Sequence, residues 1–463
     1  MTPSSDRKSA AVALNRFGLG VRPDEAAPAD PQAWLLPQFE RYAPLPQAWA
    51  DQPPSAALVA GYMEARRELR QADAAGEPAI RQKLRGLTQE RYRSAVNARV
   101  ASALTTPAPF AERLVHFWAN HFAVSIDKPP VAALAGAFEA EAIRPHVFGR
   151  FEDMLMAAER HPAMLFYLDQ VRSIGPGSAL GMRAERANAG RRRGLNENLA
   201  REILELHTLG VRSGYGQEDV TEFARALTGW GVGGLSGLPP AQQVGEFVFL
   251  PALHEPGARK VLARNYEQPG EVQASAILRD LAAAPATAKH LAAKLARHFA
   301  GDTPPPALVG RLVDSYLRSR GDLPSVYRTL FASPEAWAPA APKFKTPWEW
   351  TLSSLRGLGW RDLHGQQLAP MLAQLGQPTW RPGSPAGYDD LAASWVAPDA
   401  LMRRVELAQR LAAQTGSQLD ARVLGPQLLP GGFGEATATQ IARAESPATA
   451  LALLLASPEF LRR

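Results

Sequence analysis

The chain has 463 residues, of which 46% are hydrophobic and 21% are charged, and its formal net charge is +6. This composition excludes a disordered chain and suffices for a sizeable core, while the modest positive charge does not by itself indicate a nucleic-acid binder. The chain contains no cysteine, which excludes disulfides, thiolate zinc sites, cysteine nucleophiles and cysteine-ligated iron–sulfur clusters.

The apolar stretch near the N-terminus, residues 10–14, is too short for a signal peptide and is interrupted at once by Asn15 and Arg16. No other stretch approaches the roughly 20 apolar residues of a membrane span. We therefore expect a cytoplasmic protein without a membrane span. Export stays open, because a chain without cysteine also suits an oxidising compartment.

The periodicity predicts a mainly α, multihelical single module over residues 1–463. Its first part, residues 1–105, is expected to be an N-terminal helical arm. A short helix is expected over 9–20, and long charged helices over 63–99 are interrupted near Gly76.

Residues 106–232 are expected to form the helical core that carries the polar motifs. A long glycine-containing loop is expected over 173–194, and Asp219 is expected to be the N-cap of the last core helix. Helices are expected at 110–122, 131–146, 151–168, 195–209 and 219–228.

The remaining chain divides into two parts. Residues 233–270 are expected to be loop and a small β-hairpin insertion near 245–263, in which a strand at 245–250 pairs with 260–262 around His254. Residues 271–463 are expected to be C-terminal helices, with their most distinctive break at 344–350.

The segment 195–210 is the most informative stretch, because it mixes amides, carboxylates, an arginine and a histidine among its leucines. On a regular helix, Glu202 falls inside the apolar arc and Asn198 lies on its flank. Glu202 should therefore be at least partly buried, and a buried carboxylate must be neutral, paired, hydrogen-bonded or bound to a metal.

A second polar group lies in the helix at 110–122. His121 falls within the apolar stripe of that helix, whereas His116 falls on the other side with Glu112 and Asn120. The two histidines are therefore not expected to bind one ion from a single regular helix.

Several motifs together resemble one large bacterial family, catalogued as domain of unknown function 1800 (DUF1800). They occur in family order along nearly the whole chain, and the long asparagine–glutamate motif is highly specific. The segments are 15–18, 117–122, 196–206, 219–220, 226–230 and 343–347.

The resemblance implies a mostly helical fold and a gene that often lies beside a sulfatase-like partner family. It assigns no catalytic residue. Two departures stand out: many relatives carry export signals that this chain does not show, and residues 381–388 replace a Pro-Pro and Gly-Trp segment.

The residues that we single out form one functional hypothesis, an N/O metal site or an acid–base pair in a pocket enclosed by the helices at 110–122, 196–209 and 219–228. The metal ligands would be His121 and Glu202. The candidate catalytic residues are His121, Glu202, Asn198 and Arg201, and the candidate substrate-binding residues are His207, His254, Trp118 and Asn120.

The structural alternative gives the same side chains a packing role. His121 would be a hydrogen-bonded core histidine, and Glu202 would pair with Arg16 or Arg225 to join two helices. Glu197, Arg201 and Glu205 are spaced as an ion-pair ladder on a helix surface. The basic run 191–193 would either bind a phosphate or sulfate or keep a loop solvated.

The cofactor stays unknown. No HExxH spacing supports a divalent metal, and no specific motif supports haem, although both remain possible ligands of such a pocket. Nucleophile elbows, Walker loops and dinucleotide fingerprints do not occur in the sequence.

Whether the protein is an enzyme is left open by the sequence. The leading hypothesis is a metal-assisted or acid–base enzyme that acts on a polar small molecule or a saccharide-like substrate. The alternative is a non-catalytic scaffold that docks a partner, such as the sulfatase-like companion, and uses its polar motif to fix helix packing. No nucleic-acid partner is expected.

Overall fold

The computed structural model describes residues 3–72, 76–186, 194–235, 243–338, 343–415 and 418–463. It is mainly α-helical with two small antiparallel sheets, which confirms the predicted fold class. The basic run 191–193 lies outside the described residues.

The helices and strands have the following bounds. The α-helices are α1 (Pro3–Val12), α2 (Gln38–Arg41), α3 (Ser55–Gln71), α4 (Glu77–Thr105), α5 (Pro109–His121), α6 (Pro129–Phe138), α7 (Phe151–Arg160), α8 (Pro162–Tyr167), α9 (Ala179–Arg186), α10 (Asn198–Glu202), α11 (Gln217–Leu227), α12 (Glu271–Ala283), α13 (Pro285–Ala300), α14 (Pro306–Ser319), α15 (Leu323–Ala332), α16 (Pro347–Gly357), α17 (Leu368–Gln374), α18 (Pro398–Thr415), α19 (Ala421–Leu428), α20 (Glu435–Ala442) and α21 (Pro447–Leu455). The strands are β1 (Trp230–Val232), β2 (Phe247–Phe249), β3 (Arg259–Val261) and β4 (Arg264–Tyr266).

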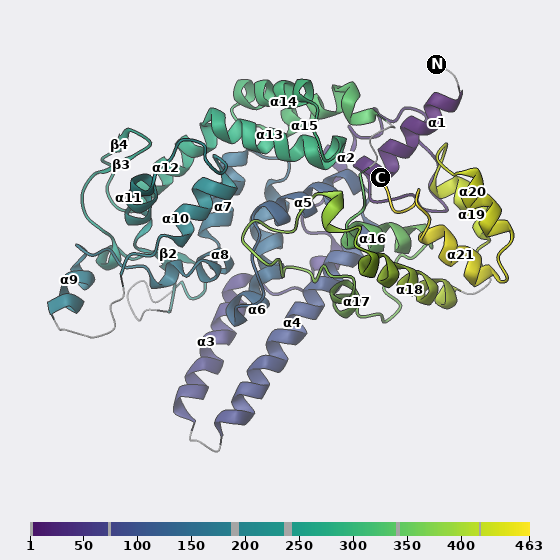
Figure 1. Cartoon of the computed structure of the whole chain (residues 1–463). Helices are drawn as coiled ribbons and strands as arrows, with labels where there is room; N and C mark the ends of the chain where they lie inside the picture. Colours follow the sequence, from purple (N-terminus) through teal and green to yellow (C-terminus); the bar gives the residue numbers. More distant parts are fainter. Residues whose placement is uncertain (1–2, 73–75, 187–193, 236–242, 339–342, 416–417) are drawn as a thin grey trace.

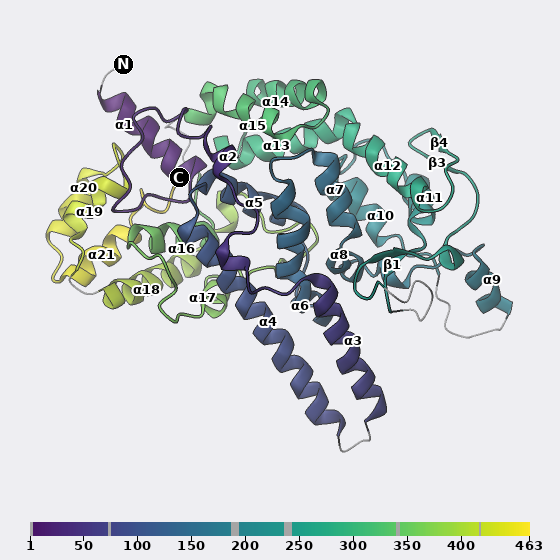
Figure 2. The ribbon, with the colours of Figure 1, turned by 180° about the vertical axis from the view of Figure 1, so that it is seen from behind.

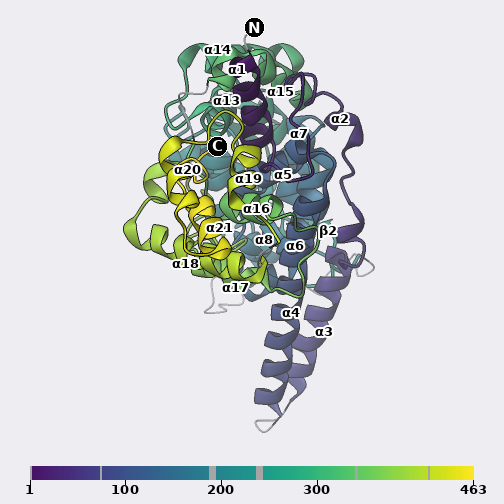
Figure 3. The same cartoon turned by 90° about the vertical axis from the view of Figure 1, so that its right-hand side faces the viewer.

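The helices pack around α5, which lies in the middle of the molecule (Figure 1). Helices α13, α14 and α15 run along one long side, and α17–α21 gather at the end where both termini lie (Figures 1 and 2). Helices α3 and α4 form an antiparallel hairpin that projects from this body in every view, including the side view of Figure 3. The predicted long helices with an interruption near Gly76 are thus confirmed.

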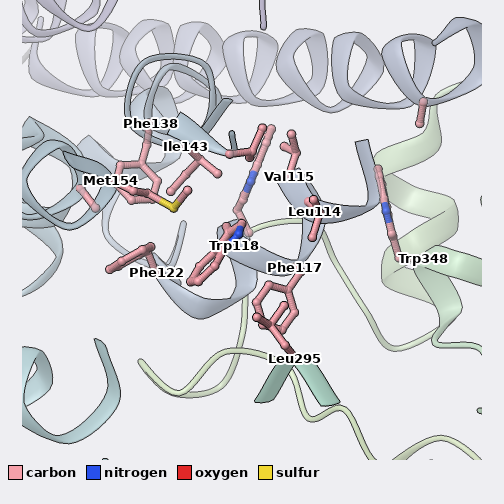
Figure 4. Close-up of a cluster of buried hydrophobic side chains, with 14 of the residues drawn as sticks. Leu114, Val115, Phe117, Trp118, Phe122, Phe138, Ile143, Met154, Leu295 and Trp348 are labelled. Carbon is pink, nitrogen blue, oxygen red and sulfur yellow. The ribbon is translucent and has the colours of Figure 1, made fainter. Parts of the chain in front are cut away.

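Helix α5 is buried on nearly its whole circumference, because other elements pack around it. It begins with Pro109, whose missing N–H costs nothing at the first helical position. Its side chains Phe117 and Trp118 lie in a cluster with Phe138 from α6 and Leu295 from α13 (Figure 4). Contacts with two neighbouring helices, α6 and α13, therefore help to fix the position of α5 and of its polar residues.

The asparagine–glutamate segment is not one regular helix. Helix α10 ends at Glu202 and continues as a π-helical turn over Ile203–His207. Because a π turn bonds i to i+5, the 100° projection fails after Glu202. Leu206 is consequently only half-buried, whereas His207 is completely buried.

The predicted pairing of the β-hairpin is wrong. Strand β2 pairs with β1, in the register Gly231↔Val248, and strand β3 pairs with β4 across a tight turn. Residues 245–250 and 260–262 therefore belong to two different sheets. The physical reason is that periodicity identifies a strand but not its partner: β2 pairs with β1, which lies well before it in the chain, and β3 pairs with β4 through a two-residue turn.

Three further expectations also need correction. The segment expected to be loop contains α9. Asp219 is not an N-cap but lies within α11, where its Oδ2 accepts a 2.8 Å hydrogen bond from the Gly216 amide. Between α17 and α18 the predicted helical region contains a long irregular segment, whose only helical part is a short turn over Ala392–Ser394. Within the described residues, no helix is long and apolar enough to cross a membrane.

Candidate functional site

A cavity of about 520 Å³ lies beside α5. Its wall is formed by α4, α5, α13, α16 and the irregular segment 377–390, which closes one side. The charged and histidine side chains in the wall are Arg99, Arg113, His116, His290, Lys294, Arg297, His298, Glu349, Asp389 and Asp390.

Helix α13 contributes a polar stripe to this wall. His290, Lys294, Arg297 and His298 are spaced i, i+4, i+7 and i+8, so they share one face. The opposite face is apolar and buried in the core, which holds the polar face toward the cavity. Sequence reasoning missed this stripe, although polar residues at helical spacing in an amphipathic helix are a signal that could have found it.

Lys294 and Arg297 are the cations of the wall without a carboxylate partner. Among the described residues, neither forms an ion pair, since Asp390 pairs with Lys343 and His298 instead, and Arg297 Nε is buried without a hydrogen-bond partner. Burial lowers the pKa of Lys294 to about 8, with Asp390 opposing the shift and Arg297 adding to it. Among the residues that the structure describes, no carboxylate forms an ion pair with either of these two cations, although Asp390 acts on Lys294 from a longer distance.

His298 and Asp390 form a pair at the cavity wall. His298 Nδ1 lies 3.0 Å from Asp390 Oδ2, so Nδ1 carries the proton that the carboxylate accepts. Burial lowers the pKa of His298 to about 4 despite Asp390, which leaves the ring neutral at pH 7. Arg463 Nη2 lies 3.5 Å from the other ring nitrogen, Nε2.

Glu349 neutralises two other cations. It accepts hydrogen bonds or ion pairs from Arg113 and Arg463, and its second oxygen accepts the Thr346 amide at 2.9 Å in the capping box of α16. Burial alone raises the pKa of Glu349, but Arg463 and Arg113 outweigh burial and lower it to about 2. Arg113 also donates to the Gly18 carbonyl at 2.6 Å, which ties the segment 15–18 to the cavity wall.

Arg99 is held by aromatic rings and by a carboxylate. It pairs with Glu139 at 2.7 Å and lies over Trp348, with 4.3 Å between the guanidinium carbon and the ring centroid. The Trp348 indole N–H donates to His116 Nδ1 at 3.1 Å. Burial lowers the pKa of His116 well below its ordinary value, so this histidine is neutral.

Asn120 fixes the segment that closes the cavity. Its Nδ2 donates to the Tyr388 carbonyl at 2.8 Å, and its Oδ1 accepts the Tyr388 amide at 2.7 Å, as a neighbouring β-strand would. Gly387 has a positive φ of 81°, and a Cβ there would overlap the Asn120 carbonyl oxygen. Asn120, predicted to bind substrate, is thus a cavity residue that also holds this segment.

Gly387→Ala is expected to displace the segment 381–390 from Asn120, because alanine disfavours this φ and its Cβ has no room. Amide hydrogen exchange should become faster at Tyr388 and its neighbours. Gly383→Ala is the matched control, since a Cβ there meets nothing within 4 Å. Equal amide exchange rates at Tyr388 in the two variants would show that the hydrogen bonds to Asn120 do not depend on Gly387.

The structure places His121 directly behind the cavity wall. Its Nε2 donates to the His207 carbonyl at 3.1 Å, and its Nδ1 accepts from Lys294 Nζ at 3.1 Å. His207 is completely buried, and its Nδ1 lies 2.7 Å from Glu159 Oε1. A buried polar chain therefore runs from Glu159 through His207 and His121 to Lys294.

The other residues chosen from the asparagine–glutamate motif lie away from the cavity wall. Glu202 is half-buried, as predicted, and burial raises its pKa. Asn198 is exposed at the start of α10. Arg201 lies 3.3 Å from Glu197 and 3.6 Å from Glu205, which confirms the predicted ladder.

The remaining predicted residues make structural contacts. Trp118 is completely buried and donates from Nε1 to the Tyr327 hydroxyl at 2.7 Å. His254 Nδ1 donates to the Thr228 carbonyl at 2.9 Å beside the sheets. Arg225, one expected partner of Glu202, forms an ion pair with Glu222 instead.

The expected pocket and metal site differ from what the structure shows. Helix α11 contributes no residue to the cavity, and the segment after α10 contributes Leu206. Both ring nitrogens of His121 are already engaged. Within the described residues, no group of three or more His, Asp or Glu side chains is placed to hold a metal ion.

Comparison with known proteins identifies the chain only at the level of a family. No curated protein and no solved structure matches it. The family model described as a protein of unknown function, DUF1800, matches residues 12–462, so this chain belongs to the DUF1800 family.

Proposed function

We propose that the cavity binds an anionic polar small molecule and that the protein acts on it by acid–base catalysis. The observation that carries this proposal is the presence of Lys294 and Arg297 on one face of α13, inside a cavity and without carboxylate partners among the described residues. Partly buried cations without counter-charges are costly unless a ligand supplies the charge.

The dimensions and chemistry of the cavity agree with a small ligand. A volume of about 520 Å³ lies within the range of small-molecule sites. Phe117, Trp348 and Trp380 supply the apolar wall, and the two cations Lys294 and Arg297 supply a few directed polar groups. A bound anion would accept charge-assisted hydrogen bonds from the two cations, and these are stronger than its hydrogen bonds to water.

The acid–base group in this proposal is His298, oriented by Asp390. The carboxylate fixes the Nδ1–H tautomer and leaves Nε2, which Arg463 Nη2 approaches to 3.5 Å, as the nitrogen that can accept a proton. Burial is the main cause of the lowered pKa of His298 and Arg463 adds to it, so a bound anion would raise this pKa by opposing the effect of Arg463. The proposal assigns no metal, and a cytoplasmic location remains a prediction from the sequence.

A second candidate function is a scaffold that docks a partner protein, such as a sulfatase-like companion. The α3–α4 hairpin favours it, because this pair of helices protrudes from the body of the molecule (Figure 3). Its basic side chains Arg67, Arg70, Arg81, Lys83 and Arg85 are exposed and could contact a partner. Deleting the end of the hairpin should abolish docking without changing the cavity.

The anion-binding proposal is tested by isothermal titration calorimetry with inorganic phosphate, sulfate and citrate. Arg297→Ala is expected to weaken binding about ten- to a hundredfold, since a hydrogen bond to a charged group contributes about 1.5–3 kcal/mol. Lys289→Ala is the matched control, because Lys289 lies on the same helix but is exposed. Equal losses in both variants, or no binding of any of the three anions by the wild type, would overturn the proposal.

A further inference from the structure

Lys294 lines the cavity and also donates a hydrogen bond to the buried histidine behind the cavity wall. Because His121 Nε2 donates to the His207 carbonyl, His121 Nδ1 carries no proton and can only accept. Lys294 Nζ donates one N–H to it over 3.1 Å. One side of the amine is thus fixed by the protein, and the rest of the group belongs to the cavity wall.

The side of the amine that faces His121 is dry. His121 is 1% exposed and is surrounded by the rings of Trp118, Phe122 and Phe151. Burial lowers the pKa of Lys294 to about 8, which increases the share of neutral amine near pH 7. A desolvated lysine beside another cation is the environment in which an amine becomes a nucleophile.

The groups that face this amine supply the rest of a reaction site. Arg297 and His298 follow Lys294 by three and four residues on α13, which places them about one turn away. His290 precedes it by four residues, and Asp390 is close enough to influence its pKa. The cation of Arg297, the imidazole of His298 and the amine of Lys294 therefore line the same cavity wall.

We propose that Lys294 forms an imine with the carbonyl carbon of a small α-oxo acid whose carboxylate lies on Arg297. This inference rests on the proposed function, because it names the anion that the cavity binds. It gives the polar chain behind Lys294 a role: His121 is a positioning residue that orients the amine toward the ligand.

The reaction balances without a further reactant. The lone pair of the neutral amine forms the C–N bond, and one amine proton passes through the neutral ring of His298 to the carbonyl oxygen, which gives a carbinolamine. The second amine proton then passes by the same ring to the hydroxyl, which leaves as water while the nitrogen lone pair forms the C=N bond of the imine. Water is the only product released, and no atom is oxidised or reduced.

The test is reductive trapping of the whole protein with glyoxylate and sodium cyanoborohydride, followed by peptide mapping. Lys294 is expected to be carboxymethylated first, and inorganic phosphate should slow its labelling. Exposed Lys289 is the control for general reactivity. Lys345 is the control for basicity, because burial lowers its pKa to about 7 but it is 1% exposed and lies outside the cavity wall. Labelling of Lys289 as fast as Lys294, or no labelling of Lys294, would overturn the inference.

Two further measurements separate this inference from the proposed function. Lys294→Arg keeps a cation but cannot form an imine, so it should lose the label at this position even at saturating glyoxylate. His121→Asn should slow the labelling of Lys294 with little effect on phosphate affinity. Wild-type protein that binds phosphate but is not labelled at Lys294 would contradict the imine alone, whereas labelling without phosphate binding would contradict the anion site.

Discussion

Replacing Arg144 by leucine is expected to lower the free energy of unfolding by about 3–5 kcal/mol. Arg144 is completely buried, and its two terminal nitrogens lie 2.9 and 2.6 Å from the two carboxylate oxygens of Glu112. Glu139 lies 3.9 Å away. Without the guanidinium, both carboxylates stay buried, with Arg99 as the remaining cation that pairs with Glu139. Urea denaturation at pH 7 measures the loss.

The double variant Glu112→Leu/Arg144→Leu separates the buried charge from the loss of packing. It should be clearly more stable than Arg144→Leu alone, because most of the cost comes from the buried Glu112 carboxylate left without its cation, with the Ser102 hydroxyl 3.2 Å away as a neutral donor, rather than from the loss of the ion pair itself. If the double variant lost the sum of the stabilities lost by the two single variants, Glu112 and Arg144 would not be coupled. Arg99 pairs with Glu139 of this network and also lines the cavity. A variant that moves Arg99 should therefore also change the cavity wall.

The second large effect concerns acid stability and Glu349. The pKa of this carboxylate is about 2 in the folded protein, below its ordinary 4.5, because Arg463 and Arg113 outweigh the effect of burial. A group whose pKa is depressed on folding stabilises the protein above its ordinary pKa and loses that contribution as the pH falls. Wild-type protein should therefore lose about 3 kcal/mol from this group between pH 5 and pH 2, at about 1.4 kcal/mol per pKa unit.

Glu349→Gln should lack this part of the acid dependence. It should be less stable than wild type at pH 7, since Arg113 and Arg463 lose their anion, and the difference between the two proteins should shrink toward pH 2. Urea denaturation at several pH values gives both curves. Parallel curves down to pH 2 would show that the carboxylate is not held in this way.

For His121, the sequence predicts burial but not the residue that it contacts. His121 was chosen because it interrupts an apolar stripe, and the structure confirms that it is buried. Its partner Lys294 follows much later in the chain and carries no local signal of that contact. Burial of a polar side chain is thus visible in a helical pattern, but the group that satisfies it is not.

Glu202 shows the opposite case. The helical projection placed it in the apolar arc, and it is half-buried. The π turn over Ile203–His207 then rotates the following residues, so that Leu206 reaches the cavity and His207 the core. A single extra residue in one turn changes which face each later side chain occupies, and propensity does not reveal it.

The sequence by itself determined the helical class, the approximate places of the helices between residues 55 and 228, and the absence of cysteine chemistry, because these depend on composition and on contacts three or four residues apart. Only the tertiary structure decided the pairing of β1 with β2, the partners of the buried charges and the cavity. Each of these joins segments far apart in the chain. Which distant side chains meet depends on how whole helices pack, and no local pattern records that outcome.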